Sequence, residues 1–318
     1  MSRDSTLGID HGTQAVRFCI LPERTFFEID RKKLLKVLVL DEIKKRFPLE
    51  KIRLVGLTYS MGDGINKITD IKKVKNRGVL QEKTGRYVGG GTKVFDEVAA
   101  SGLRAVVIPG LHRGIKTLDP RFRALYSHCA SAEKVSLGYR CYLEVNKKVG
   151  AENLIISDIS SNTVTIGIRD GKFFGAIDAC LGAIGILHGP LDLETIRRVD
   201  AGKTSANEAF YSSGAVKIYS NPKAILNPKN SSAKLALESL ILSAKMEIFS
   251  FLSEIEPEAV VITGSAGVHR NVFTALKKSL EKTAPVFKIN SYAAAIGSAE
   301  IARDILLGKR EFLGIEYL

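Results

Sequence analysis

A pattern of three short strands that occurs twice constrains the fold of this chain more than any other feature of its sequence. The first copy begins with the apolar run Leu7–Asp10, which leads through the small polar turn His11–Gln14 into a second apolar run, Ala15–Ile20. A third strand is expected over 24–30. Apolar runs joined by a short turn that contains glycine are typical of β-hairpins. The N-terminal half is therefore expected to open with an antiparallel three-strand meander.

The second copy of the pattern lies near the middle of the 318 residues. Strands are expected over 153–158, 163–169 and 172–177. In both copies the first strand ends in an aspartate, Asp10 or Asp158, and a small polar turn follows. The repetition predicts two similar halves.

The turn after Asp10 has the chemistry of a phosphate site. Gly12 can adopt backbone angles closed to other residues, and its lack of a side chain lets a ligand come close. Backbone N–H groups of the turn, with the Thr13 hydroxyl, suit phosphate oxygens, and Asp10 suits Mg²⁺ held through water. The alternative is that Asp and Gly are ordinary turn formers here.

Hydrophobic periodicity and strand-like runs predict the remaining elements. In the first half they are a helix over 30–47, a strand over 51–58, a helix from the N-cap Thr92 to Ala100, a strand over 105–108 and a long helix over about 121–149 that carries His128. In the second half they are a helix over 233–255 capped by Ser231 or Ser232, a strand over 259–263, a helix over 271–283, a strand over 286–289 and a final helix over about 292–307.

Several loops carry polar, basic or glycine-rich sequence. Asp63 lies in the exit loop after the strand 51–58, where α/β sheets tend to bind ligands, and it is either functional or a turn residue. Gly89–Gly91 precedes a helix and is either an anion site or a flexible joint. The basic segment 67–86 is interpreted as a loop-rich insertion.

The net charge of +13 is compatible with several kinds of partner. Lys and Arg concentrate in 31–53 and 67–86, and a basic surface can meet nucleic acid, an acidic cofactor or an acidic protein partner. These runs lack the interleaved aromatic residues on which bases stack. A solvated basic face is therefore favoured, and nucleic-acid binding is the weaker interpretation.

Composition also argues against several classes of protein. No apolar run reaches the roughly 20 residues that span a bilayer, and the N-terminus lacks the apolar region of a signal peptide. A cytoplasmic protein without membrane contact is therefore expected. The 4 cysteines form no CxxC pair and the 5 histidines form no HxxxH pair, so disulfides and a structural zinc are not expected.

Four segments resemble, in order, the motifs of the ASKHA superfamily, which comprises acetate and sugar kinases, Hsp70 and actin. Residues 7–17 resemble its first phosphate motif, 155–167 its second phosphate motif, 260–267 its adenosine motif and 294–300 its connecting helix. The resemblance implies an α/β fold of two duplicated RNase H-like (actin-like ATPase) domains with a cleft between them.

The same resemblance implies the domain boundaries. The first domain spans 1–152, contains an insertion near 64–92 and is completed by the C-terminal helix region 291–318. The second domain spans 153–290 and contains the adenosine-type motif.

The resemblance further implies ATP and Mg²⁺ as ligands, with Asp10 and Asp158 as the metal-coordinating residues. The implied nucleotide-binding residues are Gly12, Thr13, Gln14, Ser160, Ser161, Asn162, Thr163, Gly264, Ser265 and Gly267. The second phosphate motif usually carries glycines after its aspartate, and Ser160–Asn162 stand in their place. Their side chains either crowd a phosphate or donate hydrogen bonds to it.

One segment resembles a narrower group within the superfamily. Tyr126–His128, followed by Lys134, is similar to the helix that carries a transition-state histidine in acetate and butyrate kinases. That similarity implies a small carboxylate as the acceptor. Over its whole length the chain is similar to the methanogenesis marker protein 12 family of archaea, which implies a methanogen-associated pathway.

The candidate catalytic residues depend on the acceptor. For a hydroxyl acceptor a base is required, and Asp158 or Asp63 is the candidate. For a carboxylate acceptor no base is needed, and His128, with Arg113 or Arg198, stabilises the transferring group. The alternative for His128 is a histidine that packs within a helix.

Two functions remain open at this level. One is an ATP-dependent phosphotransferase on a small molecule, whose acceptor the sequence does not identify. The other is a nucleotide-dependent switch or assembly factor with slow or absent turnover, which the replacement of glycines by Ser160–Asn162 and the basic surface favour. A nucleic-acid-binding protein is a third and weaker interpretation, because it rests on charge alone.

Overall fold

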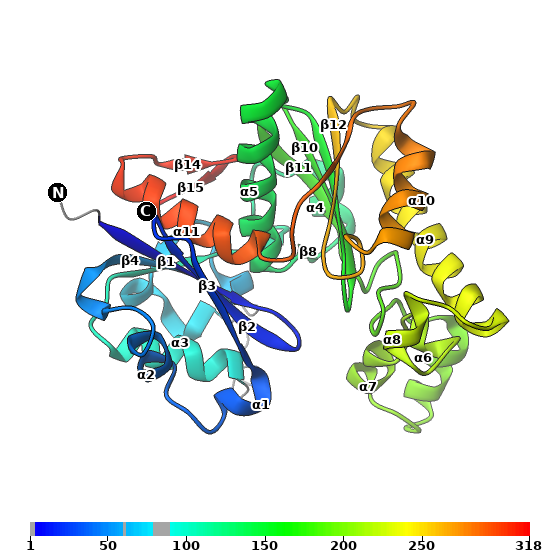
Figure 1. The fold of residues 1–318 in the computed structure, drawn as a ribbon, viewed down its shortest axis with the longest axis horizontal. Coiled ribbons are helices and arrows are strands. Elements are labelled where there is room, and N and C mark those ends of the chain that lie inside the picture. The colour runs from blue at the N-terminus through cyan, green and yellow to red at the C-terminus, as the bar shows by residue number, and fades with distance from the viewer. Residues whose placement is uncertain (1–3, 60–61, 79–89) are drawn as a thin grey trace. The chain divides into compact units, whose positions relative to one another are not determined.

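The computed structural model of the chain describes residues 4–59, 62–78 and 90–318. The backbone forms two compact units (Figure 1), of which the first is Met1–Leu143 with Tyr292–Leu318. The second unit is Glu144–Ser291. Each unit is built around one mixed β-sheet.

The first unit has its large sheet at the N-terminal end of the chain. Its strands are β1 (Ser5–His11), β2 (Ala15–Leu21), β3 (Thr25–Asp30), β4 (Ile52–Thr58), β5 (Thr69–Asp70) and β6 (Ala105–Ile108). They lie in the order β3-β2-β1-β4-β6-β5. β1 pairs antiparallel with β2 and parallel with β4, so the predicted meander is confirmed and continues into a parallel sheet.

Helices and short elements complete this unit. The helices are α1 (Arg31–Leu34), α2 (Val39–Lys44), α3 (Gly90–Ala100), α4 (Pro120–Leu125), α5 (Ala132–Val149), which ends in the second unit, and α11 (Ala293–Leu306). The short elements are η1 (Leu49–Lys51), η2 (Gly62–Gly64), η3 (Ile71–Lys73), η4 (Lys75–Gly78), the pair β7 (Leu111–His112) and β8 (His128–Ala130), and the pair β14 (Glu311–Phe312) and β15 (Ile315–Glu316).

α11 lies directly against β1 and β4 because glycines of the strands face its backbone. A Cβ built on Gly8 would lie 2.0 Å from the carbonyl oxygen of Ala295. One built on Gly56 would lie 2.2 Å from the carbonyl oxygen of Ser298. Backbone therefore touches backbone, which positions without a side chain allow.

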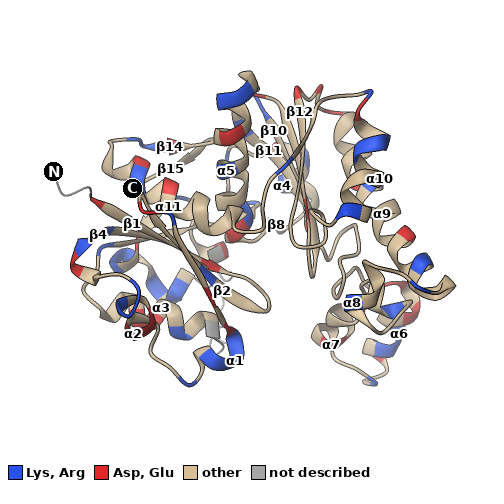
Figure 2. Cartoon of the chain, in the orientation of Figure 1, with Lys and Arg blue, Asp and Glu red and all other residues tan. Residues whose placement is uncertain are grey.

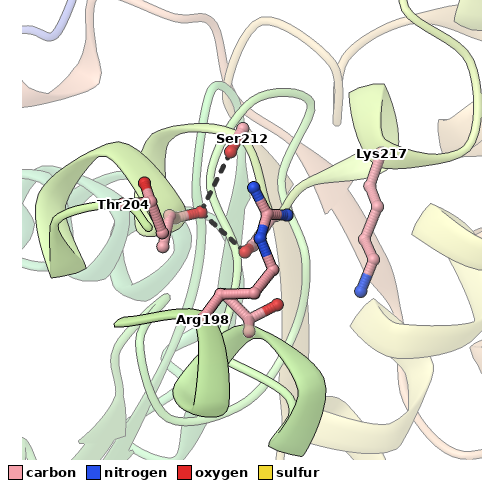
Figure 3. A pocket seen from close by; sticks show the side chains of 7 residues that line it. Arg198, Thr204, Ser212 and Lys217 are labelled. Atoms are coloured by element: carbon pink, nitrogen blue, oxygen red, sulfur yellow. Dashed lines mark hydrogen bonds between the residues drawn. The ribbon is translucent and has the colours of Figure 1, made fainter. Parts of the chain in front are cut away.

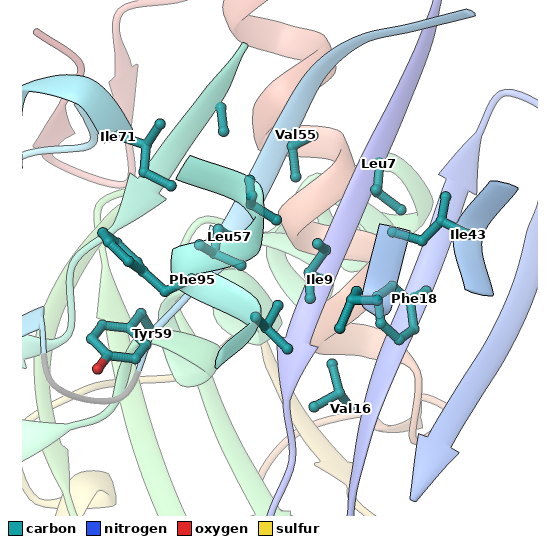
Figure 4. Close-up of a cluster of buried hydrophobic side chains, with 14 of the residues drawn as sticks. Leu7, Ile9, Val16, Phe18, Ile43, Val55, Leu57, Tyr59, Ile71 and Phe95 are labelled. Atoms are coloured by element: carbon teal, nitrogen blue, oxygen red, sulfur yellow. The ribbon is translucent and has the colours of Figure 1, made fainter. Parts of the chain in front are cut away.

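The other face of the same sheet carries the main apolar core (Figure 4). Side chains alternate between the two faces of a strand, so Leu7 and Ile9 of β1 point away from α11. Both are fully buried, and they pack in one cluster with Ile43 of α2 and Phe95 of α3. The sheet is thus covered on both faces.

The helix predicted over 30–47 is broken into α1 and α2, so its continuity was predicted wrongly. Lys93 of α3 stabilises the break between α1 and α2. Its ammonium donates to the carbonyl oxygens of Leu34 at 2.9 Å and Val37 at 2.6 Å. Carbonyls at a helix end need partners, and here a distant residue supplies them. Local periodicity does not reveal such a contact.

The long helix predicted over about 121–149 is also wrong, because the chain forms α4, β8 and α5 instead. Tyr126 ends α4 with an extended backbone, and the following residues pair with β7. His128 therefore lies on a strand and not on a helix. Cys129 and Ala130 are fully buried there, and a short buried strand shows the same apolar pattern as a buried helical turn.

The second unit repeats the sheet of the first. Its strands are β9 (Leu154–Ile159), β10 (Thr163–Arg169), β11 (Lys172–Ile177), β12 (Ala259–Thr263) and β13 (Val286–Lys288). Its helical elements are α6 (Leu193–Asp200), α7 (Ala206–Tyr211), η5 (Ala215–Lys217), α8 (Pro222–Ile225), α9 (Ser231–Leu252) and α10 (Arg270–Leu280). The order β11-β10-β9-β12-β13 matches β3-β2-β1-β4-β6 strand for strand. The α/β fold of two duplicated, RNase H-like domains is confirmed.

Two predicted helix caps are displaced along the chain. Thr92 lies within the first turn of α3 and is not its N-cap. Asn230, and neither Ser231 nor Ser232, caps α9, since its side-chain oxygen accepts the N–H of Ala233 at 2.8 Å. Capping residues of similar type stand next to one another here, and the backbone decides between them.

Charge is spread over both units. Lys and Arg occur on helices and loops of each (Figure 2). Among the described residues, no helix combines the length and the apolar character that crossing a bilayer requires.

Replacing Gly8 by alanine tests the close packing of α11 on the sheet. The new methyl group would overlap the Ala295 carbonyl, so we expect Gly8→Ala to lower the free energy of unfolding by about 3 kcal/mol or more. Gly102→Ala is the matched control, because a Cβ there meets no atom within 4 Å and adds only the strain of a φ of +76°, about 1 kcal/mol. Chemical denaturation measures both, and equal losses would contradict the backbone contact.

Candidate functional site

In the second unit, the end of β9 and the loop after β12 are joined through the side chain of Ser160. Asp158 is 5% exposed, and Thr263 pairs with it in parallel register. The Ser160 hydroxyl donates to Asp158 Oδ1 at 3.0 Å and accepts the backbone N–H of Ser265 at 3.1 Å. One hydroxyl thus bridges the segment that resembles the second phosphate motif and the segment that resembles the adenosine motif.

Gly264 has no room for a side chain beside this bridge. Its φ is +85°, and a Cβ there would lie 2.1 Å from Asp158 Oδ1. The next N–H groups, of Ala266 and Gly267, both donate to the carbonyl oxygen of Ile159, at 2.9 and 2.8 Å. The loop after β12 is therefore fixed against the end of β9 by backbone hydrogen bonds and by steric fit.

The segment 184–188 packs against the turn 160–162 and forms hydrogen bonds with it. The N–H of Ile186 donates to the carbonyl oxygen of Ser160 at 2.9 Å. A Cβ at Gly185 would lie 2.3 Å from the backbone of the turn, so the two segments are in direct contact. The turn is thereby positioned by the protein itself.

A buried glutamate that the sequence reasoning missed anchors the beginning of this segment. Glu247 of α9 is 4% exposed, and its Oε1 accepts the N–H of Ala183 at 2.5 Å. A Cβ at Gly182 would lie 2.3 Å from the same oxygen. A glutamate at a core position of a helix is rarely buried unless it is paired or hydrogen-bonded, and this was the signal that could have found it.

Glu247 is held largely in its neutral form. Burial raises the pKa of its carboxyl to about 8, and the nearby carboxylate of Asp178 adds to the rise. Hydrogen bonds from Thr165 and from the N–H of Ala183 act in the opposite direction. Loss of its proton would place a buried negative charge next to Gly182 and Ala183, where the segment that supports the turn 160–162 begins.

The hairpin of the first unit places Asp10 in the position equivalent to Asp158. Asp10 is 2% exposed, and its Oδ2 lies 3.6 Å from Nη1 of Arg17. Thr13 and Gln14 are exposed at the tip of the turn. A Cβ on Gly12 would lie 2.7 Å from a carbonyl oxygen of β2, so this glycine too is constrained by close approach.

His11 is buried next to the first turn of α3. It is 5% exposed, and its ring lies edge-on to Tyr59 with centroids 6.1 Å apart. Burial, and then the charge of Arg31, lower its pKa to about 3. The imidazole is therefore neutral, and a Cβ on Gly91 would lie 3.2 Å from its Cδ2 atom.

A carboxylate–imidazole pair joins Asp63 to His128 in the first unit, two residues that the sequence singled out separately. Nδ1 of His128 lies 3.0 Å from each carboxylate oxygen of Asp63. The His128 side chain is 25% exposed and that of Asp63 36%, so a small ligand can reach both. The antiparallel pair of β7 and β8 fixes His128, because its backbone pairs with that of His112, whose Nε2 lies 3.0 Å from the carbonyl oxygen of Ile65.

The remaining predicted residues are placed as follows. Lys134 is 4% exposed at the start of α5, with its ammonium 3.9 Å from a carboxylate oxygen of Glu133. Arg113 is exposed after β7, and Arg198 is exposed on α6.

The basic and glycine-rich segments lie partly outside the described residues. Of Gly89–Gly91, the first glycine is outside them and the other two begin α3. Of 67–86, residues 67–78 contain β5, η3 and η4, and the rest lie outside. The anion site considered for Gly89–Gly91 stays a prediction.

A polar pocket of about 80 Å³ lies between α6, α7 and η5 in the second unit (Figure 3). It is lined by Thr195, Arg198, Thr204, Ala209, Ser212, Ser213 and Lys217. The Ser213 hydroxyl donates to the carbonyl oxygen of Ala209 at 2.7 Å, and Lys217 forms an ion pair with Asp192. Much of the pocket wall is thus satisfied within the protein.

The described residues contain no group of three His, Cys, Asp or Glu side chains that could hold a metal ion unaided. Mg²⁺ in phosphoryl-transfer sites is instead held by one or two carboxylates together with waters and phosphates. Asp10 and Asp158, buried at the ends of equivalent strands, fit that donor set.

Comparison with known sequences gives close relatives. No protein-family model matches the chain. It is 53% identical to a UPF0285 protein of Methanocaldococcus jannaschii over 98% of each chain. It is 48% identical to a UPF0285 protein of Methanococcus maripaludis, over 97% of this chain and 98% of that one.

Comparison with solved structures gives the fold. A propionate kinase from Francisella tularensis matches 95% of this chain and 99% of its own with a TM-score of 0.71 at 14% identity. An acetate kinase from Porphyromonas gingivalis matches 95% of this chain and 100% of its own, with a TM-score of 0.67 at 12% identity. A ROK family glucokinase from Streptomyces griseus matches 94% of this chain and 99% of its own, with a TM-score of 0.54 at 15% identity. The chain therefore has the ASKHA fold.

Glu247→Gln tests whether this carboxyl is buried in its neutral form. With a folded-state pKa of about 8, above the ordinary 4.5, the contribution of this carboxyl to stability is complete below about pH 4.5 and is lost as pH rises towards 8. The glutamine of the variant cannot ionise, so the free energy of unfolding of the variant should fall less over this range than that of the wild type. The two losses should differ by up to about 5 kcal/mol. Urea denaturation from pH 5 to 9 measures the difference.

Glu238→Gln is the control for this prediction, since Glu238 lies exposed on the same helix. It should follow the wild-type pH profile. Parallel profiles for wild type and Glu247→Gln would show that the carboxyl ionises normally.

Proposed function

Because the chain belongs to the UPF0285 family of methanogenic archaea and has the ASKHA fold of acetate and sugar kinases, we propose that it is an ATP-dependent phosphotransferase acting on a small carboxylate. The observation that carries the proposal is the pair formed by Asp63 and His128. The kinase neighbours supply the fold, and the residues of this chain supply the argument for the acceptor.

We assign nucleotide binding to the turns that follow Asp10 and Asp158. In the second unit the turn 160–163 carries the Ser161 hydroxyl and the Asn162 amide, which suit phosphate oxygens, and the loop at Gly264–Gly267 is fixed beside this turn. In the first unit the turn Gly12–Gln14 suits phosphate oxygens as well. Phosphoryl transfer is mainly positioning and charge stabilisation, so turns fixed in advance by the protein suit this role.

Mg²⁺ would be held by Asp10 or Asp158 through carboxylate oxygens or bound water. When bound, the ion supplies neutralisation of phosphate charge. The hydroxyl of Ser160 contributes by orienting one oxygen of Asp158, which it contacts at 3.0 Å.

We assign the binding site of the phosphoryl acceptor to the surroundings of His128. Nδ1 of His128 lies within hydrogen-bond distance of both carboxylate oxygens of Asp63, which fixes the orientation of the ring. A histidine whose ring is oriented by a carboxylate is suited to stabilise charge on a phosphoryl group in transfer. Because Asp63 is engaged by His128 and Asp158 is assigned to Mg²⁺, neither candidate base is available to a hydroxyl, and a carboxylate acceptor, which needs no base, is favoured.

A second candidate function is a nucleotide-dependent switch or assembly factor with slow turnover. The observation that favours it is the occupation of the second phosphate turn by Ser160–Asn162, where kinases of this fold carry glycines. The Ser160 hydroxyl is committed to Asp158 and to the N–H of Ser265. A turn whose hydroxyl is already bonded within the protein offers fewer donors to a phosphoryl group in transfer, which favours slow turnover.

A kinase assay with His128 and Asp63 variants separates the two functions. With ATP, Mg²⁺ and a pool of short-chain carboxylic acids, wild type should consume ATP in an acid-dependent manner. His128→Ala should lower kcat at least about 100-fold, and Asp63→Asn about tenfold, because it only positions the ring.

Asp4→Asn, at an exposed surface position, is the control and should retain full activity. ATP binding without acid-dependent consumption would support the switch. Unchanged turnover in His128→Ala would exclude the assigned acceptor end.

Asp158→Asn tests the nucleotide end. Calorimetric titration should show that Mg²⁺ strengthens ATP binding to the wild type and that this strengthening falls at least about tenfold in the variant. Asp170→Asn, in the exposed turn between β10 and β11, is the matched control and should behave as wild type. An undiminished effect of Mg²⁺ in Asp158→Asn would remove Asp158 from the metal site.

A further inference from the structure

An apolar stripe runs along the outer face of α9 in the second unit. Leu235, Leu242, Met246 and Phe249 are 56%, 60%, 66% and 49% exposed. The inner face of the same helix packs on β9 and β10, so this helix is apolar on both sides. A helix that is apolar all round is normally covered all round.

The neighbouring helix α10 does not share this exposure. α10 packs against α9, but its outer positions are polar, among them Thr274, Lys277 and Lys278. One helix thus presents a solvated face, whereas its neighbour presents four large apolar side chains. Contiguous exposed apolar surface of this kind marks an interaction site.

The spacing of the stripe identifies what can cover it. Leu235, Leu242 and Phe249 are seven residues apart, which is two helical turns, and they therefore line one seam. The seam is symmetric about Leu242. A second α9 laid antiparallel, with Leu242 on the two-fold axis, would place Leu235 against the partner subunit's Phe249, so the seam is complementary to itself.

The charges beside the seam select the same arrangement. Glu238 and Lys245 are also seven residues apart, so they lie on the same edge of the stripe. In an antiparallel pair equal edges face each other, which brings Glu238 close to the partner subunit's Lys245 twice. A parallel pair would set this edge against the opposite edge of the partner and would not form these two contacts.

We propose that the chain forms a two-fold homodimer through antiparallel pairing of α9 helices along Leu235, Leu242, Met246 and Phe249. α9 has 22 residues and is therefore about 33 Å long. Two such helices bury on the order of 1,000 Å², which is at the low end for a specific interface, so we expect a weak dimer with a dissociation constant on the order of micromolar. The proposal concerns assembly and does not depend on catalytic activity.

Sedimentation velocity of the full chain between about 1 and 100 µM tests the proposal. Wild type should shift from monomer to dimer over this range. Leu242→Glu keeps a good helix former and should remain monomeric at every concentration, because it places two carboxylates on the axis. Circular dichroism shows whether the variant is folded.

Thr274→Glu, on the outer face of α10, is the matched control and should dimerise as wild type. A wild type that is monomeric at 100 µM would overturn the proposal. So would a folded Leu242→Glu variant that still dimerises.

Charge reversal tests the antiparallel geometry. Glu238→Lys and Lys245→Glu should each weaken the dimer about tenfold, since each turns two attractive contacts into repulsive ones. The double variant should recover wild-type affinity, and an equimolar mixture of the two single variants should form a heterodimer. Single variants that dimerise as wild type does would contradict this pairing.

Discussion

The absence of space for a side chain at Gly264 is the constraint on which the candidate nucleotide site of the second unit depends. Parallel pairing of β9 with β12 sets Thr263 opposite Asp158, and the chain turns at the next residue with a φ of +85°. Any Cβ there would occupy the place of the Asp158 carboxylate. The same turn brings the N–H of Ser265 to the Ser160 hydroxyl. Steric fit and one side-chain bridge therefore join two motifs that lie about a hundred residues apart in the sequence.

The two units use the same strand order but compensate their buried aspartates differently. Asp10 faces the guanidinium of Arg17, whereas Asp158 accepts the hydroxyl of Ser160. A buried carboxylate needs a charge or a donor nearby, and both solutions meet that need.

Much of the fold could be predicted from the sequence because the strands carry period-two or continuous apolar patterns bounded by turns. The helices at 30–47 and 121–149 were predicted wrongly because their ends depend on distant groups. Lys93 satisfies carbonyls at the first break, and pairing with β7 forms the strand that carries His128. Likewise, the meeting of Asp63 with His128 depends on tertiary structure, which no local pattern encodes. Individual residues of the candidate site were therefore visible in the sequence, whereas their contacts were not.

The kinase proposal and the switch proposal both require that the turn containing Ser160–Asn162, where glycines are expected, binds the phosphates of a nucleotide. The most direct test of this requirement is a crystal structure of the protein grown with Mg²⁺ and a non-hydrolysable ATP analogue. We expect the phosphates to lie against the turn 160–163, with Mg²⁺ beside Asp158 and the base near Gly264. An analogue bound with its phosphates away from that turn, or no bound analogue at millimolar concentration, would contradict this expectation.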